Sequence, residues 1–215
     1  MKDSTVGPTT ALSDDDDLRL FRTWMTGDRD AGAALVERYY DAVVRFFRTK
    51  VGDHADDLVQ RTFLLVSEAG DRYRAQASFR AFLYGVARNV FLEFLRACTR
   101  DRLQDPDFAV SSLIDLRTGI STRAARLEAQ RLLIDCLQQL PVDLQLAVEL
   151  FYWEGVTVAE LAEIQGVPAG TIKSRLHRAR HLLREALDRM DATPPEKTQV
   201  SAVFEAWPAS PSVDA

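Results

Sequence analysis

The chain has 215 residues, 47% of them apolar, and a formal net charge of -5, which is enough sequence for one large or two small globular domains. It contains no apolar run of 18 residues, and its first residues lack the apolar segment of a secretory signal, so we expect neither a membrane span nor export. The cysteines, Cys98 and Cys136, do not form a CxxC pair and are typical of reduced thiols in a cytoplasmic protein.

The first half of the chain predicts helices and no strand. Residues 1–17 are polar and end in an acidic run, which predicts a disordered N-terminus. Helical periodicity then follows over 29–50, 54–69 and 79–98, with one apolar side in each segment. We therefore expect a first small helical domain over residues 18–102.

The second half predicts another helical domain after a change in composition. Residues 103–122 lose the periodicity and contain Pro106 and Gly119, so we expect a flexible linker. Periodicity returns over 123–190, with breaks at Pro141 and Gly155. Residues 191–215 contain four prolines and no period, which predicts a disordered tail. The predicted fold class is all-α, with two small helical domains.

The segment GVPAGTIKSRLHRAR at 166–180 has the features of a helix-turn-helix. Thr157 and Glu160 form a capping box that starts the first helix, and Gly166 can make the turn before the second. The second helix has an apolar stripe and a basic stripe beside it. The apolar stripe contains Ile172, Leu176, Ala179, Leu183 and Leu187. Such a helix can bury one face and insert the other into the major groove of DNA.

Positive charge gathers in two places on this acidic chain. Residues 72–102 hold seven arginines against Glu93 and Asp101, and residues 171–189 hold six cationic side chains against Glu185 and Asp188. Two separate basic patches indicate two contacts with a polyanion, although a basic helix face can also simply be solvated.

Other chemistries find little support in the sequence. His177 and His181 have the spacing of metal ligands on one helix, but no third ligand stands beside them, so we expect no metal and no cofactor. The chain lacks the P-loop, GxSxG, HExxH and CxxC motifs. We therefore expect no enzyme activity and no small-molecule substrate.

Two blocks of the sequence resemble a known family. GTIKSRLHRARHLLREAL, preceded by LPVDLQLAVELFYWEGVTVAELAEIQGVP, resembles region 4 of the extracytoplasmic-function sigma factors of the sigma-70 family. HADDLVQRTFLLV and FRAFLYGVARNVFLEFLR resemble regions 2.2 and 2.3–2.4 of the same factors. The resemblance covers residues 18–102 and 123–187 and implies a factor that initiates transcription from a specific set of promoters. The partners it implies are bacterial core RNA polymerase, promoter DNA and an anti-sigma factor.

The resemblance also implies three sets of site residues. The residues expected at the -35 element are Thr171, Lys173, Ser174, Arg175, His177 and Arg178. Those expected at the -10 element are Tyr73, Arg74, Arg80, Arg88, Asn89 and Arg96. Those expected on polymerase are Asp56, Asp57, Leu58 and Gln60. Asp56 and Asp57 would in any case favour a helix N-terminus through its dipole.

Three positions depart from the family pattern. Arg61 stands where the family usually has an acid, which bears on the affinity for polymerase. Ser67 stands where a tryptophan is frequent, and Gln145 where an arginine is usual, which predicts one phosphate contact fewer. Two alternatives remain at this level. A repressor or activator that works without polymerase would leave 54–102 unexplained, and a helical protein-interaction scaffold would leave the basic stripe unused.

Overall fold

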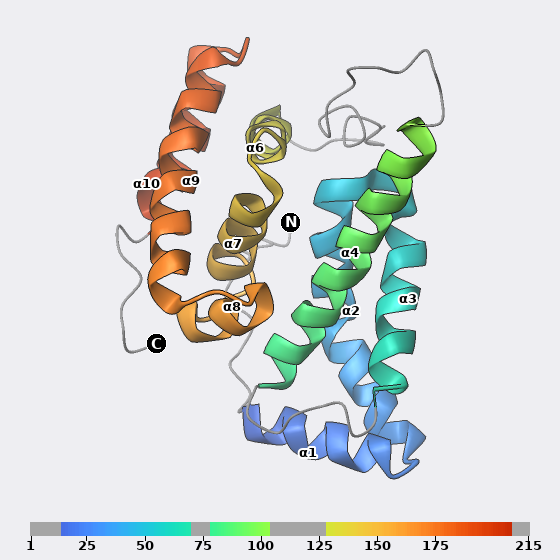
Figure 1. Cartoon of the computed structure of the whole chain (residues 1–215). Coiled ribbons are helices and arrows are strands. Elements are labelled where there is room, and N and C mark those ends of the chain that lie inside the picture. Colours follow the sequence, from blue (N-terminus) through green and yellow to red (C-terminus); the bar gives the residue numbers. More distant parts are fainter. Residues whose placement is uncertain (1–13, 70–77, 104–127, 208–215) are drawn as a thin grey trace, which may run out of the picture.

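The computed structural model describes residues 14–69, 78–103 and 128–207, and every regular element in these ranges is a helix (Figure 1). This confirms the predicted all-α class. Residues 14–103 supply one group of helices, called here the first unit, and residues 128–207 supply the second unit. The two units lie side by side, the first in blue to green and the second in yellow to red (Figure 1).

The first unit is built from four α-helices and a short 3-10 turn. They are α1 (Asp14–Met25), α2 (Arg29–Val51), the turn Gly52–His54, α3 (Ala55–Ser67) and α4 (Phe79–Leu103). The corner between α1 and α2 depends on Gly27, which has a φ of 102°, and on Asp28, whose carboxylate accepts the first amides of α2. Phe21, Phe47 and Phe79 are buried in the core of this unit.

The N-terminus is ordered earlier than predicted. Residues 14–17 form the first turn of α1, so the prediction of disorder is wrong for them, and residues 1–13 lie outside the described ranges. The cause is Asp17, which is only 3% exposed and accepts hydrogen bonds from Arg38 and from the Tyr39 hydroxyl of α2. Asp17, which the acidic run suggests is exposed to solvent, therefore makes a tertiary contact between α1 and α2.

The second unit contains five helices, one of which is largely buried among the other four. They are α6 (Glu128–Gln138), α7 (Val142–Tyr152), α8 (Val158–Gln165), α9 (Ala169–Arg189) and α10 (Pro194–Ala206). Every residue of α7 from Leu144 to Leu150 is buried, because neighbours cover all of its sides. Cys136 of α6 is also buried, which raises the pKa of its thiol to about 12, and Cys98 and Cys136 are not joined in a disulfide.

The predicted disordered tail is wrong for residues 194–206, which form α10. Thr193 and Glu196 make a capping box at its start, and the two prolines occupy the first turn, where a missing amide hydrogen costs nothing. Phe204 and Trp207 are buried, and Trp207 stacks on Tyr152 with ring centroids 4.2 Å apart. α10 packs on α6 and α9 and so belongs to the second unit.

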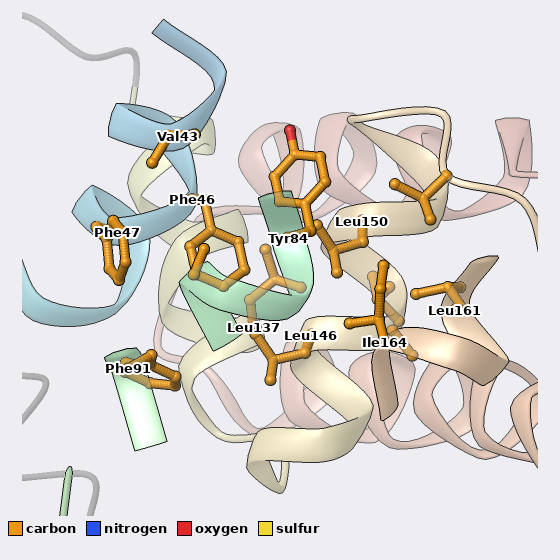
Figure 2. Close-up of a cluster of buried hydrophobic side chains, with 14 of the residues drawn as sticks. Val43, Phe46, Phe47, Tyr84, Phe91, Leu137, Leu146, Leu150, Leu161 and Ile164 are labelled. Carbon is orange, nitrogen blue, oxygen red and sulfur yellow. The ribbon is translucent and has the colours of Figure 1, made fainter. Parts of the chain in front are cut away.

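The two units share one apolar cluster. Figure 2 shows Phe46 of α2 and Tyr84 of α4 beside Leu137, Leu146 and Leu150 of the second unit, and all five side chains are buried. The densest contact between the units is that of α4 with α8. Most of the predicted linker lies outside the described residues, so its flexibility and the domain boundaries stay predictions.

Candidate nucleic-acid interface

The turn between α8 and α9 is fixed by local contacts. The Glu160 amide donates to the Thr157 hydroxyl at 3.2 Å, and the Thr157 amide donates to the Glu160 carboxylate at 2.8 Å. Gly166 ends α8 in the left-handed conformation, with φ 65° and ψ 37°. The Val167 amide then closes the turn on the Ala162 carbonyl at 3.0 Å. These contacts set the angle at which α9 leaves the turn.

α9 separates its apolar and basic sides as predicted. Its five predicted apolar residues are buried. Four of the predicted DNA-contacting residues lie together on the exposed side, within the first turns of the helix. They are Lys173, Ser174, His177 and Arg178. The start of α9, with Pro168, Ala169 and Gly170, is exposed as well. A helix with this face can approach a groove with its N-terminal end first.

Two further residues predicted on α9 are placed differently. Thr171 is half-buried at the base of the face. Arg175 turns back into the protein, where it hydrogen-bonds Gln165 and donates to the Asp143 carboxylate at 3.2 Å. Gln165 in turn donates to the Asp143 carbonyl at 3.0 Å. Arg175 therefore ties α7, α8 and α9 together in this arrangement.

The residues predicted on α4 fall into two groups. Asn89 and Arg96 are exposed. Arg80 and Arg88 instead meet acids of the second unit: Arg80 contacts Glu160 at 3.0 Å, and Arg88 contacts Asp143 at 3.5 Å. Tyr73 and Arg74 lie outside the described residues.

Glu160 has two functions that the sequence reveals only in part. One carboxylate oxygen caps α8 and also accepts from Arg80 of the first unit, while the other accepts from Ser78 and Arg80. Burial alone would raise the pKa of this carboxyl group, but the hydrogen bond from Ser78, the backbone bond from Thr157 and the charge of Arg80 together lower it. Glu160 is therefore a charged group held between the two units.

A buried ion pair joins the units at another point. Lys50 of α2 and Glu149 of α7 are in contact, and their side chains are 0% and 3% exposed. Glu149 also accepts from the Thr49 hydroxyl at 3.1 Å and from the Gln145 amide at 2.7 Å. The sequence predicted that Gln145, in place of the usual arginine, leaves one phosphate contact fewer; its side chain lies in the core, where its amide donates to Glu149.

The predicted polymerase-contacting residues lie on α3. Asp56, Asp57 and Gln60 are exposed, whereas Leu58 is only 8% exposed and packs into the core, so its side chain is not on this surface. Arg61 is exposed and pairs with Glu93 of α4 at 2.9 Å. The sequence analysis missed Leu64 and Leu65, which are 57% and 37% exposed one turn further along. The signal in the sequence is that Leu64 and Leu65 fall outside the helical period of the buried residues of α3, so that two apolar side chains are left for the surface.

Two further features of the described ranges concern other functions. No helix in them is long and apolar enough to cross a membrane. No group of three His, Cys, Asp or Glu side chains in the same ranges gathers as metal ligands would. His181 lies near Glu185, at 3.3 Å, on the solvent side of α9.

Two family models match the chain and together cover more than half of it. The model described as sigma-70 region 2 matches residues 35–101, and the model described as sigma-70, region 4 matches residues 130–183. The first match contains α3 and most of α4, and the second contains α8 and the exposed basic face of α9.

Curated proteins and solved structures with similar sequences carry related names. The ECF RNA polymerase sigma-E factor of Haemophilus influenzae is 28% identical over 170 residues, which is 75% of this chain and 89% of that protein. The ECF RNA polymerase sigma factor SigW of Bacillus subtilis is 26% identical over 170 residues, covering 75% and 91%. The structure of CnrH with the cytosolic domain of CnrY has a TM-score of 0.62 at 26% identity, covering 82% of this chain and 99% of that one. The structure of RpoE with the anti-sigma factor NepR from Bartonella quintana has a TM-score of 0.60 at 27% identity, covering 73% and 96%.

Proposed function

The chain belongs to the sigma-70 family as an extracytoplasmic-function RNA polymerase sigma factor, and from this premise we propose which of its surfaces bind DNA and which binds polymerase. In this proposal α9 reads the -35 element, α4 and the preceding segment read the -10 element, and α3 docks on core polymerase. The observation that carries the assignment is the exposed face at the start of α9. Cationic side chains and hydrogen-bond donors lie together on this face, and the turn at Gly166 directs the helix outward.

The -35 assignment follows from side-chain chemistry. Lys173 and Arg178 supply positive charge for phosphates and, in the case of Arg178, a planar fork that can donate two hydrogen bonds to a guanine. Ser174 and His177 add donors that suit base edges or phosphates. Ser174 already donates to the Gly170 carbonyl at 3.0 Å, so its oxygen is held near the start of the helix. Arg175 and Thr171 support this face from below.

The -10 assignment places the melting surface on the first unit. Asn89 and Arg96 are exposed on α4, and Arg80 and Arg88 lie on the side of α4 that faces the second unit. Tyr73 and Arg74 belong to the same proposed surface. Holding an unstacked base costs a few kcal/mol per step, and an aromatic ring with nearby cations offsets this cost.

The docking assignment rests on a mixed surface of α3. Asp57, Gln60, Arg61 and Leu64 follow helical spacing, so they lie on one side of the helix, and all four are exposed. Exposed leucines beside acids are typical of a surface that another protein covers. Core polymerase is the partner that the family provides for this surface.

We infer two further properties from the relatives. Both similar structures were solved with a bound partner, and one of these partners is named an anti-sigma factor, so we expect this chain to have an anti-sigma partner too. Its site of action is the cytoplasm, where the polymerase is. Sigma factors initiate transcription without catalysing it themselves, so we expect no enzyme activity from the isolated chain.

Transcription from purified components tests the proposal. Genomic fragments are first selected with holoenzyme made from this chain and sigma-free core polymerase, and are then used as templates. Discrete transcripts that depend on the added chain are expected. A chain that binds the same fragments without core polymerase and yields no transcripts would be acting as a repressor or activator, and a chain that binds neither would be a scaffold.

A further inference from the structure

The arginines assigned to the -10 element are held by acids of the other unit. Glu160 of α8 contacts Arg80 at 3.0 Å, and Asp143 of α7 contacts Arg88 at 3.5 Å. Asp143 also contacts Arg175 of α9 at 3.2 Å. One carboxylate therefore bridges an arginine from each of the two helices that the proposed function assigns to DNA.

A carboxylate in this position resembles the ligand that the arginines would otherwise bind. Guanidinium groups donate to carboxylates and to phosphates through the same N–H fork. The side chains of Arg80 and Arg88 are only 25% and 18% exposed in this arrangement. DNA can reach neither of them fully until Glu160 and Asp143 move away.

We propose that this closed arrangement is a self-inhibited state of the free protein, in which Glu160 and Asp143 compete with promoter DNA for Arg80 and Arg88. Separation of the two units then releases both arginines together. The inference rests on the assignment of these arginines to DNA under the proposed function.

Beside the shared apolar cluster, the interface contains polar contacts that suit a reversible closure. Lys50 and Glu149 form the buried pair, the Gln138 amide donates to the Thr49 carbonyl at 3.0 Å, and the Tyr84 hydroxyl donates to Glu154 at 2.9 Å. Charged and polar groups of this kind regain water when an interface opens, so this interface separates more readily than one of the same size that is apolar throughout.

Closure also leaves the other proposed surfaces accessible. Lys173, His177 and Arg178 on α9 and Asp57 and Gln60 on α3 are exposed while the units are in contact. The closed protein can therefore meet polymerase through α3 before its -10 surface is released. Because the units are parts of one chain, the acids act at a high effective concentration, and DNA alone competes poorly with them.

Lys50→Glu is the decisive variant, because it places two carboxylates in contact with each other at the centre of the closure. It also lowers the net charge, which by itself weakens binding to DNA. We expect a larger radius of gyration in small-angle X-ray scattering and, for a fluorescein-labelled duplex of fixed sequence, an affinity about ten-fold higher by anisotropy, because a larger fraction of the protein is competent to bind. The swap Lys50→Glu with Glu149→Lys restores the pair and should return both readings to those of the wild type.

A second variant covers the case in which Lys50→Glu does not fold, as judged by circular dichroism. Arg45 and Glu154 pair at 3.1 Å at the rim of the same interface, and Arg45→Glu should open the protein less, with a smaller gain in affinity. Unchanged or weaker DNA binding by an expanded variant overturns the inference, and so does a compact form of both variants.

Transcription with core polymerase separates this failure from that of the proposed function. Variants that support transcription without any gain in free DNA binding overturn the self-inhibited state alone. If the wild type and the variants all fail to support transcription, both the proposed function and the self-inhibited state are overturned.

Discussion

The two helices assigned to DNA present their cations differently. α9 holds Lys173 and Arg178 in solvent, whereas α4 has Arg80 and Arg88 in contact with Glu160 and Asp143 of the second unit. The face of α9 is determined by its own unit, through the turn at Gly166 and the buried stripe behind it. The face of α4 depends on where the other unit lies. A basic helix face is therefore a binding surface only where the tertiary structure leaves it uncovered.

The largest expected effect comes from a substitution in α10, the helix that packs against α9. Phe204 of α10 is 1% exposed and packs in the second unit, where α10 contacts α6 and α9. Phe204→Ala should lower the free energy of unfolding by about 3–5 kcal/mol and weaken DNA binding through α9. Chemical denaturation measures the first effect. Gln199→Ala, on the exposed side of the same helix, should change stability by less than about 0.5 kcal/mol.

A third surface should be independent of both DNA-reading helices. Asp57→Arg with Gln60→Ala should weaken core polymerase binding by about 2–5 kcal/mol, because a reversed charge that becomes buried on docking is left unpaired. Transcription should collapse, while the free chain should bind a promoter fragment as tightly as the control variant of matched charge does. A pull-down with core polymerase measures the loss, and Glu37→Arg on α2 is the control of matched charge. Full polymerase binding by the double variant would show that this face of α3 is not the surface that docks on core polymerase.

Acid should loosen the contact at α4 and leave the face of α9 in place. The pKa of Glu160 is lowered from its ordinary value of 4.5, so its contribution to stability is complete above that value and is lost as the pH falls through the lowered pKa. Unfolding free energies measured from neutral pH down to acid should decline in this window. Glu160→Gln should be less stable near neutral pH and show a shallower decline, and an identical slope in the two proteins would mean that other groups carry the effect.

The smallest expected effect concerns Arg61, which pairs with Glu93 across an exposed surface, with 59% and 54% of the two side chains accessible. Pairs of this kind contribute about 0–1 kcal/mol, so Arg61→Glu should change stability little. It restores the charge usual in the family, and we expect polymerase binding to be equal or tighter in the same pull-down. Weaker binding would show that Arg61 itself contacts the polymerase.

Local features of this fold were predictable and long-range ones were not. The capping box at Thr157, the turn at Gly166 and the stripe on α9 depend on residues within a few positions of each other, so their spacing was sufficient. The start of α10 carries the same kind of signal in Thr193 and Glu196, but the neighbouring prolines were interpreted as a tail.

Ion pairs between the two units could not be predicted from local spacing. Lys50 and Glu149 stand far apart in the chain, and nothing in the pattern around either residue indicates a buried partner. The same holds for Asp143, which meets Arg88 and Arg175 only because α4, α7 and α9 converge. The residues on α4 could be predicted as basic and exposed by periodicity, but which of them the second unit covers could not.

The most direct measurement compares Arg178→Ala and Arg88→Ala in the free chain and in the holoenzyme, on one selected promoter fragment. Arg178→Ala should weaken binding by about 1–3 kcal/mol in both forms, because its side chain is exposed in the closed protein. Arg88→Ala should weaken binding in the holoenzyme and leave the free chain unchanged, because Asp143 already occupies Arg88 there. An equal loss from Arg88→Ala in both forms would show that the -10 surface is open in the free protein and would contradict the account.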